Sequence, residues 1–219
     1  YYVSGFTEPE AVTVITSGDT VRSMLFCRPK HEEREIWDGF RHGPEAARET
    51  FAFDETYSIE EFDALLPKLL AGAPNLFYSV GFDESFDARI TRALNAVRNM
   101  ARSGLSTPSA IRDVRAMLDP MRLVKDASEI ATMRQAAAIS TAAHKRAMRA
   151  TRPGRNECEI EAEIIHEFIR NRATGHAYNP IIASGPNACV LHYNDNNQVC
   201  KDGDVILLDF GAEYANYAA

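Results

Sequence analysis

Two helix-start signals of the same kind constrain the second half of this chain more than any other feature of its sequence. Asp126 stands three positions before Glu129, and Asn156 stands three positions before Glu159. A side chain that accepts a backbone N–H, followed by a glutamate at the third helical position, is the capping box that begins α-helices. The pattern therefore predicts two successive helices.

The residues that follow each helical pattern predict where the helix ends. The first should end near Thr151, because Pro153 and Gly154 cannot continue it. The second should end before Gly175. Its inward-facing stripe is expected to consist of Ile160, Ile164, Ile165, Phe168 and Ile169. An apolar run over 205–208, set off by a turn, is expected as a strand, so the order is helix, helix, then strands.

The first half alternates between two kinds of local pattern. Runs rich in β-forming residues are expected as strands over 11–16, 23–27 and 76–78, whereas helical periodicity is expected over 59–70 and 86–101. Ser58 and Glu61 form a capping box before the first of these helices. The alternation is typical of an α/β domain with a central sheet.

A stretch rich in turn formers separates the two halves. It includes Gly104, Pro108 and Pro120, around one short helical run. We place the boundary at about residue 122. The predicted organisation is an N-terminal α/β domain over 1–122 and a second domain over 123–219.

The composition excludes several functional classes. The chain is 45% apolar and 25% charged, with a formal net charge of -7, and no apolar run approaches the roughly 18 residues needed to span a bilayer. Binding to nucleic acid requires clustered Lys and Arg that neutralise phosphates, and no basic stripe is present. We therefore expect a globular protein with neither a membrane nor a nucleic acid as partner.

The cysteines suggest a reducing compartment. Cys27, Cys158, Cys189 and Cys200 are scattered, without a CxxC pair or other close spacing, so neither a zinc knuckle nor a disulfide framework is expected. This usage is typical of the cytoplasm. Cys189 and Cys200 flank His192 and could form a nucleophile pair for it, but the apolar neighbours of Cys189 favour a small core residue there.

One aspartate and one histidine are the candidate functional residues of the second half. Asp209 follows the apolar run 205–208, which predicts a carboxylate at the rim of a buried strand. A negative charge in that position needs a nearby cation or a hydrogen-bond donor. The alternative is a carboxylate that accepts backbone hydrogen bonds at a strand-to-turn junction. His192 follows a loop of small and turn-forming residues. By itself it could be a structural group as well as a functional one.

Four stretches of the sequence resemble one known family. They are YYVSGFTEPEA at the start, DASEIATMRQAAAIS in the middle, SGPNACVLHYNDNN, and KDGDVILLDFGAEYANYAA at the end. All four resemble the proline-specific aminopeptidases (aminopeptidase P) of the creatinase and prolidase group. The resemblance implies an α/β N-terminal creatinase-like domain, a mixed sheet with flanking helices, followed by the first part of an α+β pita-bread catalytic domain.

The same resemblance implies the chemistry of the site. Such enzymes hold two divalent metal ions, usually manganese, with two Asp, one His and two Glu, and a bridging water or hydroxide is the nucleophile. Asp209 matches the first of these aspartates, and His192 matches a substrate-facing histidine that is not a ligand. The implied substrate is a peptide with proline in second position, which loses its N-terminal residue. The implied assembly is a homo-oligomer, a dimer or a tetramer.

The other four metal ligands match no position in this chain. The resemblance places the second aspartate directly beyond Ala219, and the histidine and two glutamates further on. Two divalent ions need several donors each, so we expect the chain by itself to be inactive and the function to belong to the intact protein. Tyr1 is also not expected to be the natural start, because the sequence begins without an initiating Met, a basic n-region or an apolar h-region; the true N-terminus and any targeting signal are expected to be missing.

Weaker candidates lie around this site. Trp37 is expected to pack in the first domain, but in the resembling family it could also wall the proline pocket of another subunit. Arg102, at the end of a helix, is a weaker candidate for the same role and otherwise a helix-terminal charge. His176 is close in sequence to the site segment and could line its edge. His166 fails the HExxH zinc pattern, since Arg170 occupies the position of the second imidazole.

Other activities are open at this point. A prolidase, a methionine aminopeptidase and a creatinase share the fold, but the methionine enzyme usually lacks the first domain, and the start of this chain favours aminopeptidase P over prolidase. A different class is a binding or scaffold protein that keeps the pita-bread architecture without catalysis. An acidic residue directly after Ala219, with a downstream His and two Glu, would favour the enzyme.

Overall fold

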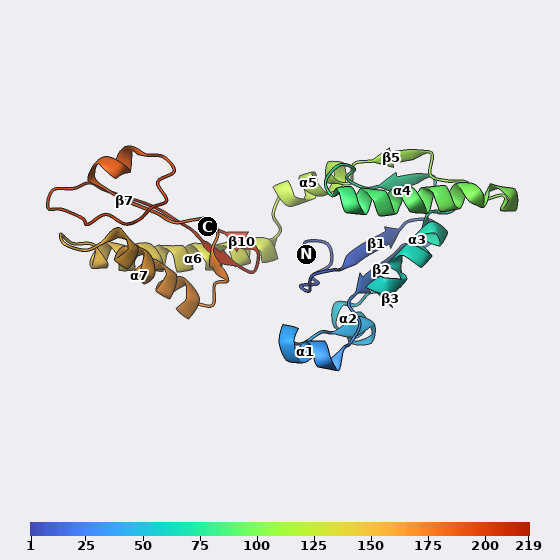
Figure 1. Cartoon of the computed structure of the whole chain (residues 1–219), viewed down its shortest axis with the longest axis horizontal. Helices are drawn as coiled ribbons and strands as arrows, with labels where there is room; N and C mark the ends of the chain where they lie inside the picture. Colours follow the sequence, from blue (N-terminus) through green and yellow to red (C-terminus); the bar gives the residue numbers. More distant parts are fainter. The chain divides into compact units, whose positions relative to one another are not determined.

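The computed structural model describes all residues from 1 to 219, which form two compact units, Tyr1–Asp119 and Pro120–Ala219 (Figure 1). The boundary proposed from the sequence, at about residue 122, falls within helix α5 (Arg115–Leu123). No helix is both long enough and apolar enough to cross a membrane. Each unit buries apolar clusters of its own and is described separately.

A three-stranded sheet forms the centre of the first unit. β1 (Val12–Thr16) pairs antiparallel with β2 (Arg22–Cys27), and β2 pairs parallel with β3 (Glu55–Ser58). The parallel pair needs a crossover connection, which is supplied by α1 (Glu32–Asp38) and α2 (Gly43–Phe51). The sheet is therefore mixed, as the resemblance implies.

Strand β2 separates two apolar layers, because successive residues of a strand point to opposite faces. One layer lies between the sheet and helices α3 (Phe62–Leu70) and α4 (Glu84–Asn99). It contains Met24, Phe26, Phe62, Leu66, Leu70, Ile90, Ala93, Leu94 and Val97. The other layer lies against α2 and contains Phe6, Leu25, Cys27, Ala47 and Phe53. The helices expected from periodicity thus cover one face of the sheet.

The first unit also has elements that the sequence patterns did not predict. A second sheet is made by β4 (Asn75–Phe77) and β5 (Ala110–Arg112), which pair in parallel, and of these only β4 was expected. Helices α1 and α2 and strand β3 were not expected either. The capping box of Ser58 and Glu61 is confirmed, but it begins a 3-10 turn (Ile59–Glu61) that leads into α3.

Two helices begin the second unit, and both of their predicted caps are confirmed. Asp126 caps α6 (Ala127–Ala150), and Asn156 caps α7 (Glu157–Arg170), each within a complete capping box. Helix α6 ends at Thr151, as predicted. The two helices pack along each other and form one wall of the core.

Two small antiparallel sheets complete the second unit. One has the order β10-β9-β6 and is made of Tyr217–Ala218, Ala212–Tyr214 and Gly175–His176. The other pairs β7 (Ile181–Ser184) with β8 (Ile206–Asp209). Their apolar side chains close the core against the helices. The buried cluster is Ile139, Ala143, Ala147, Ile160, Ile164, Phe168, Ala173, Ile182, Cys200, Phe210 and Ala212.

Two predictions about burial in the second unit are wrong. Ile165 and Ile169, expected on the inward stripe of α7, are 36% and 55% exposed. Strand β8 alternates between partly buried and exposed residues, and Val205 before it is 73% exposed, so this strand is not buried. In both cases only one face of the element meets neighbours within the unit, whereas an apolar run in sequence does not show how many faces are covered.

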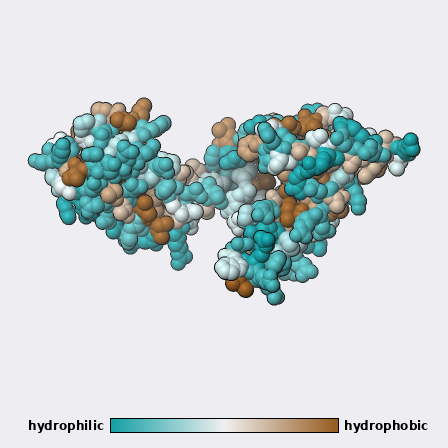
Figure 2. Space-filling model, in the orientation of Figure 1, coloured by the Kyte–Doolittle hydropathy of each residue, from teal (hydrophilic) through white to brown (hydrophobic).

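The surface is mainly hydrophilic, and exposed apolar side chains form scattered patches (Figure 2). Two of the most exposed are Trp37, at 87%, and Leu191, at 89%. Single exposed apolar residues are usual on protein surfaces. Leu191 is nevertheless notable because it directly precedes the candidate residue His192.

Candidate functional site

Asp209 is the last residue of β8 and faces Ile181 of β7 across the hairpin. Its side chain is exposed, and its Oδ1 accepts a hydrogen bond of 2.7 Å from the hydroxyl of Tyr178. Burial and the nearby carboxylate raise the pKa of Tyr178 to about 12, so the hydroxyl keeps its proton and stays a donor at neutral pH. The tyrosine thus fixes one carboxylate oxygen, and Oδ2 has no protein partner.

A donor meets the charge of Asp209, as expected, but the rest of this environment differs from both expectations. The carboxylate is not at the rim of a buried strand, so its charge is not desolvated by that strand. No backbone N–H donates to it either. Its orientation depends instead on a side chain 31 positions away in sequence, which no local pattern reveals. An exposed, oriented oxygen donor is suited to bind a cation.

His192 lies in a turn that follows a short 3-10 helix (Gly185–Cys189). The imidazole is exposed, and no hydrogen bond or ion pair joins it to Asp209. The next residue, Tyr193, is buried at 8% exposure. The chain therefore presents His192 outward from a segment that is anchored directly behind it.

The anchor is Glu157, a residue that the sequence reasoning missed. It is the first residue of α7 and has no exposed surface. Its Oε1 accepts from the amide and the hydroxyl of Ser184, at 2.7 and 2.6 Å, and its Oε2 accepts from the Tyr193 hydroxyl at 2.8 Å and the Gln198 amide at 2.9 Å. A glutamate at the start of a helix is ordinarily a surface residue, so no signal in the sequence could have found this cluster.

The carboxylate of Glu157 stays ionised despite its burial. Burial alone raises the pKa of a carboxyl group, but the bonds from Ser184, Gln198 and Tyr193 outweigh it, so the pKa of Glu157 lies below its usual value. The charge is satisfied entirely by donors from three separate segments. This arrangement ties the start of α7 to β7 and to the segment that carries His192.

A pH dependence of stability follows from the lowered pKa of Glu157. The ionised form stabilises the fold above the pKa of an unfolded glutamate, about 4.3, and this contribution is lost as the pH falls through the lower folded value. At pH 7, Glu157→Gln should lower the free energy of unfolding by about 1–3 kcal/mol, because an amide nitrogen then meets two donors. Urea denaturation should show this difference shrinking towards pH 3. A difference independent of pH would contradict the assignment.

Comparison with known proteins shows which families the two parts of the chain resemble. Residues 131–219 match metallopeptidase family M24, and residues 1–85 match the aminopeptidase P N-terminal domain. The chain is 40% identical over 220 residues to the Xaa-Pro aminopeptidase of Escherichia coli K12. The second part of the chain is thus similar to metallopeptidase family M24, and the first part is similar to the N-terminal domain of aminopeptidase P. The resemblance of the chain to the aminopeptidase P group, and the fold class which that resemblance implies, are confirmed.

Solved structures of relatives match this chain over its whole length. Zinc-substituted E. coli aminopeptidase P in complex with product gives a TM-score of 0.96 at 40% identity, and the aminopeptidase PepP of Pseudomonas aeruginosa gives 0.96 at 41%. Both matches cover 100% of this chain and 50% of the other. The E. coli curated relative is likewise covered to 50% of its length, so the chain spans about half the length of the relatives that it matches.

Family M24 implies divalent metal ions, and the donor set within these 219 residues does not fit them by itself. No group of three or more His, Cys, Asp or Glu side chains is close enough to hold a metal ion. Asp209 offers one free carboxylate oxygen, whereas Ca²⁺, Mg²⁺ and Zn²⁺ sites use four or more ligands. Asp209 can therefore be at most one member of a larger ligand set.

The weaker site candidates lie in different parts of the chain. His176 is exposed on β6, where it pairs with Ala212 of β9. The amide of Ala177 donates to the carbonyl of Gly211, so the segment that carries His176 runs beside the one that carries Asp209. Arg102 lies in a 3-10 turn after α4, in the first unit, and is exposed. The structure brings His176 near the Asp209 segment within the second unit.

Trp37 was expected to pack in the first unit, and this expectation is wrong. The side chain lies on the short helix α1, which buries no residue at all, and it is 87% exposed. A seven-residue helix with three acidic residues in its first turn has too little apolar surface to form a core. The possibility that Trp37 covers a pocket in another subunit is therefore untouched.

The exposure of Trp37 predicts its fluorescence, because it is the only tryptophan. The isolated 219-residue chain should emit at the wavelength of free indole in water, and iodide should quench it nearly as strongly as a tryptophan amide. If Trp37 walls a pocket in another subunit, the part of the full-length oligomer's emission that Trp37→Phe removes should lie at a shorter wavelength and be protected from iodide. Protected emission from the isolated chain would contradict the structure.

The expectation that Cys189 is a small core residue is wrong. Cys189, expected in the core, is exposed, whereas Cys200 is buried. Burial raises the pKa of the Cys200 thiol, which lowers the fraction of reactive thiolate at neutral pH. No hydrogen bond joins either sulfur to His192. The geometry thus gives no support to a cysteine nucleophile.

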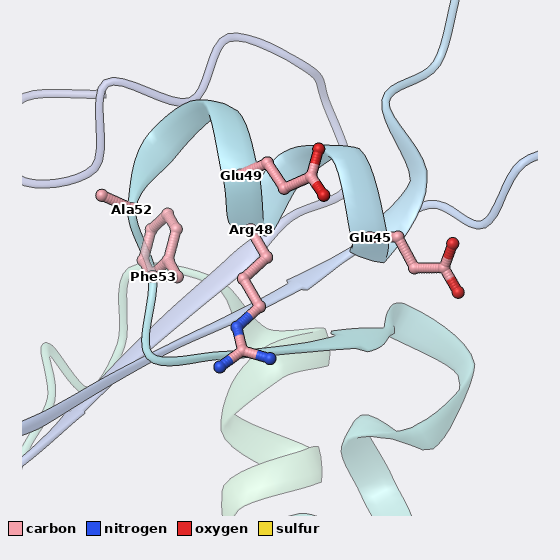
Figure 3. Close-up of a pocket in the computed structure, with 5 residues that line it drawn as sticks. All are labelled: Glu45, Arg48, Glu49, Ala52 and Phe53. Atoms are coloured by element: carbon pink, nitrogen blue, oxygen red, sulfur yellow. The ribbon is translucent and has the colours of Figure 1, made fainter.

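A surface pocket lies elsewhere, at the end of α2 in the first unit (Figure 3). It is lined by Glu45, Arg48, Glu49, Ala52 and Phe53. Figure 3 shows Glu45 and Glu49 directed away from the Arg48 guanidinium, so these charged groups do not converge on one point. None of the candidate site residues lines this pocket, and it is not part of the candidate site.

Proposed function

We propose that the whole protein is a metal-dependent aminopeptidase that removes the N-terminal residue from peptides with proline in second position. The observation that supports this most directly is the match to E. coli aminopeptidase P, at 40% identity and a TM-score of 0.96 across the entire chain. We further propose two divalent ions, which we take to be manganese, a homo-oligomeric assembly and a cytoplasmic location.

The bond that such an enzyme cleaves explains why a dedicated site is needed. The amide before proline is tertiary and has no N–H. A protease that recognises its substrate through a hydrogen bond from this N–H therefore cannot bind an Xaa-Pro peptide in the same way. Recognition must come from a pocket that fits the pyrrolidine ring. We propose that His176 lines the edge of this pocket. We propose Trp37 and, more weakly, Arg102 for the wall of the pocket in another subunit.

Within this chain, His192 and Asp209 have separate proposed roles. His192 is exposed and free of protein partners, so it can donate a hydrogen bond to the carbonyl oxygen of the substrate. Asp209, oriented by Tyr178, would be one carboxylate ligand of the metal pair. We propose that the other ligands belong to the part of the protein that corresponds to the remaining half of the relatives, and that the present chain alone is inactive.

The test compares peptides that differ only at the second residue. Full-length protein, loaded with manganese, should release the N-terminal residue from an Xaa-Pro-Yaa tripeptide and leave the matching Xaa-Ala-Yaa peptide intact. Removal of metal by EDTA should abolish release, and added manganese should restore it. Equal cleavage of both peptides would refute proline specificity. Cleavage of Xaa-Pro dipeptides alone would indicate a prolidase, and no cleavage at all would indicate a binding or scaffold protein.

A further inference from the structure

We propose that Glu157 and Tyr193 form a positioning clamp that holds His192 in the orientation required for catalysis. The clamp is the cluster already described: the buried carboxylate of Glu157, the hydroxyl of Tyr193, and the donors of Ser184 and Gln198. The catalytic consequence rests on the proposed function of His192. Neither clamp residue reaches the substrate in this proposal, since both act through the segment that carries the histidine.

The first reason is the geometry of the carboxylate. Its two oxygens accept four bonds, all from donors, and two of these come from Tyr193 and Gln198, which stand on the C-terminal side of His192. The other two come from Ser184, at the end of β7 on its N-terminal side. One fully buried carboxylate therefore holds the chain on both sides of the exposed segment that contains His192. A buried charge is a stringent anchor, because displacing any donor leaves it unsatisfied.

The second reason is an independent anchor in the same segment. Asn196 is buried and adopts a left-handed backbone conformation, with φ of 45°. Its Oδ1 accepts from the Ile182 amide at 3.0 Å, and its Nδ2 donates to the Pro180 carbonyl at 2.8 Å and to Glu161 at 3.0 Å. The side chain thus takes the place of a strand partner along β7. Left-handed conformations are most accessible to Gly, Asn and Asp, so the residue type fits the position.

The contrast in burial points to positioning of one particular residue. Leu191 and His192 are exposed, whereas Tyr193 and Asn196 are buried. The hydrogen-bonded residues of the clamp therefore end at Tyr193, which is joined to His192 by a peptide bond. A shift of this peptide would move the imidazole directly. Displacements of about 1 Å in a catalytic group can reduce a rate by about 100-fold.

The first test measures the clamp without reference to activity, by hydrogen exchange in full-length protein. Tyr193→Phe removes a single hydroxyl, and Glu157→Gln replaces one acceptor by a donor. Both should accelerate exchange in residues 190–199 by at least about 10-fold. The matched control is Glu163→Gln, on the same helix, where the carboxylate accepts from Arg146 of α6 and not from residues 190–199. Exchange in 190–199 unchanged by Tyr193→Phe and Glu157→Gln would overturn the clamp.

The second test asks whether the clamp acts through His192. Tyr193→Phe should lower kcat by about 10- to 100-fold with KM within about 2-fold of the wild type. In a protein that already carries His192→Ala, the same change should alter kcat by less than about 2-fold. Equal losses in both backgrounds would overturn positioning. If the wild type cleaves no Xaa-Pro peptide, the proposed function and this consequence both fall, while hydrogen exchange still decides whether the clamp exists.

Discussion

Full-length protein carrying Asp209→Ala is expected to lose metal from its site and to lose activity by at least about 100-fold. Removal of groups that merely support a metal ligand commonly costs 10- to 100-fold in affinity or activity, so removal of a ligand should cost at least as much. The expectation depends on the free Oδ2 of Asp209 and on the orientation that Tyr178 gives to the carboxylate. Metal content per subunit and the rate of Xaa-Pro cleavage measure the two effects.

The matched control for this prediction is Asp202→Ala. Asp202 is an exposed aspartate in the turn that precedes β8 and makes no side-chain hydrogen bond. Its removal should change neither metal content nor rate. Full metal content and near-normal activity in Asp209→Ala would show that this carboxylate is not a ligand.

The variant His192→Ala should separate catalysis from metal binding. Metal content should stay close to that of the wild type, because His192 is proposed as a substrate-facing donor and not as a ligand. kcat should fall by about 100- to 1,000-fold, the usual loss when one donor that stabilises developing charge is removed. His166→Ala, on the exposed side of α7, is the control and should be neutral. Loss of metal in His192→Ala would show that the role assigned to the histidine is wrong.

The caps of the two long helices were predictable because the information that fixes them is local. Asp126 and Asn156 each satisfy backbone N–H groups within their own first turn, and both capping boxes form as the spacing indicates. The end of α6 at Thr151 is equally local, since the proline and glycine that follow cannot extend a helix. Such features depend little on tertiary contacts.

Burial was predicted less well because it depends on what lies across from each side chain. Ile165, Ile169 and Val205 are apolar and exposed, and Glu157 is charged and fully buried. Sequence composition assigns each of them to the opposite environment. Short elements such as β3 and β5 were missed for a related reason. A strand of three or four residues is defined by its partner strand more than by its own pattern.

The candidate site was predictable only in part. The resemblance to aminopeptidase P singled out Asp209 and His192, but not the residues that orient them. Tyr178, which orients Asp209, lies 31 positions before it. Glu157 and Tyr193, which hold the segment of His192 through their mutual hydrogen bond, lie 36 positions apart. Side chains that meet across such separations leave no local periodicity. The structure is therefore needed to find the groups that orient a candidate site, even where a resemblance to a family points to its residues.

Anomalous X-ray diffraction from manganese-soaked crystals of the full-length protein tests the central claim most directly. We predict a peak in the anomalous map within roughly 2.0–2.5 Å of a carboxylate oxygen of Asp209, the range of oxygen–metal distances for divalent ions in proteins. The peak should disappear in crystals of Asp209→Ala. A map without a peak beside this carboxylate would contradict the assignment of Asp209 as a metal ligand.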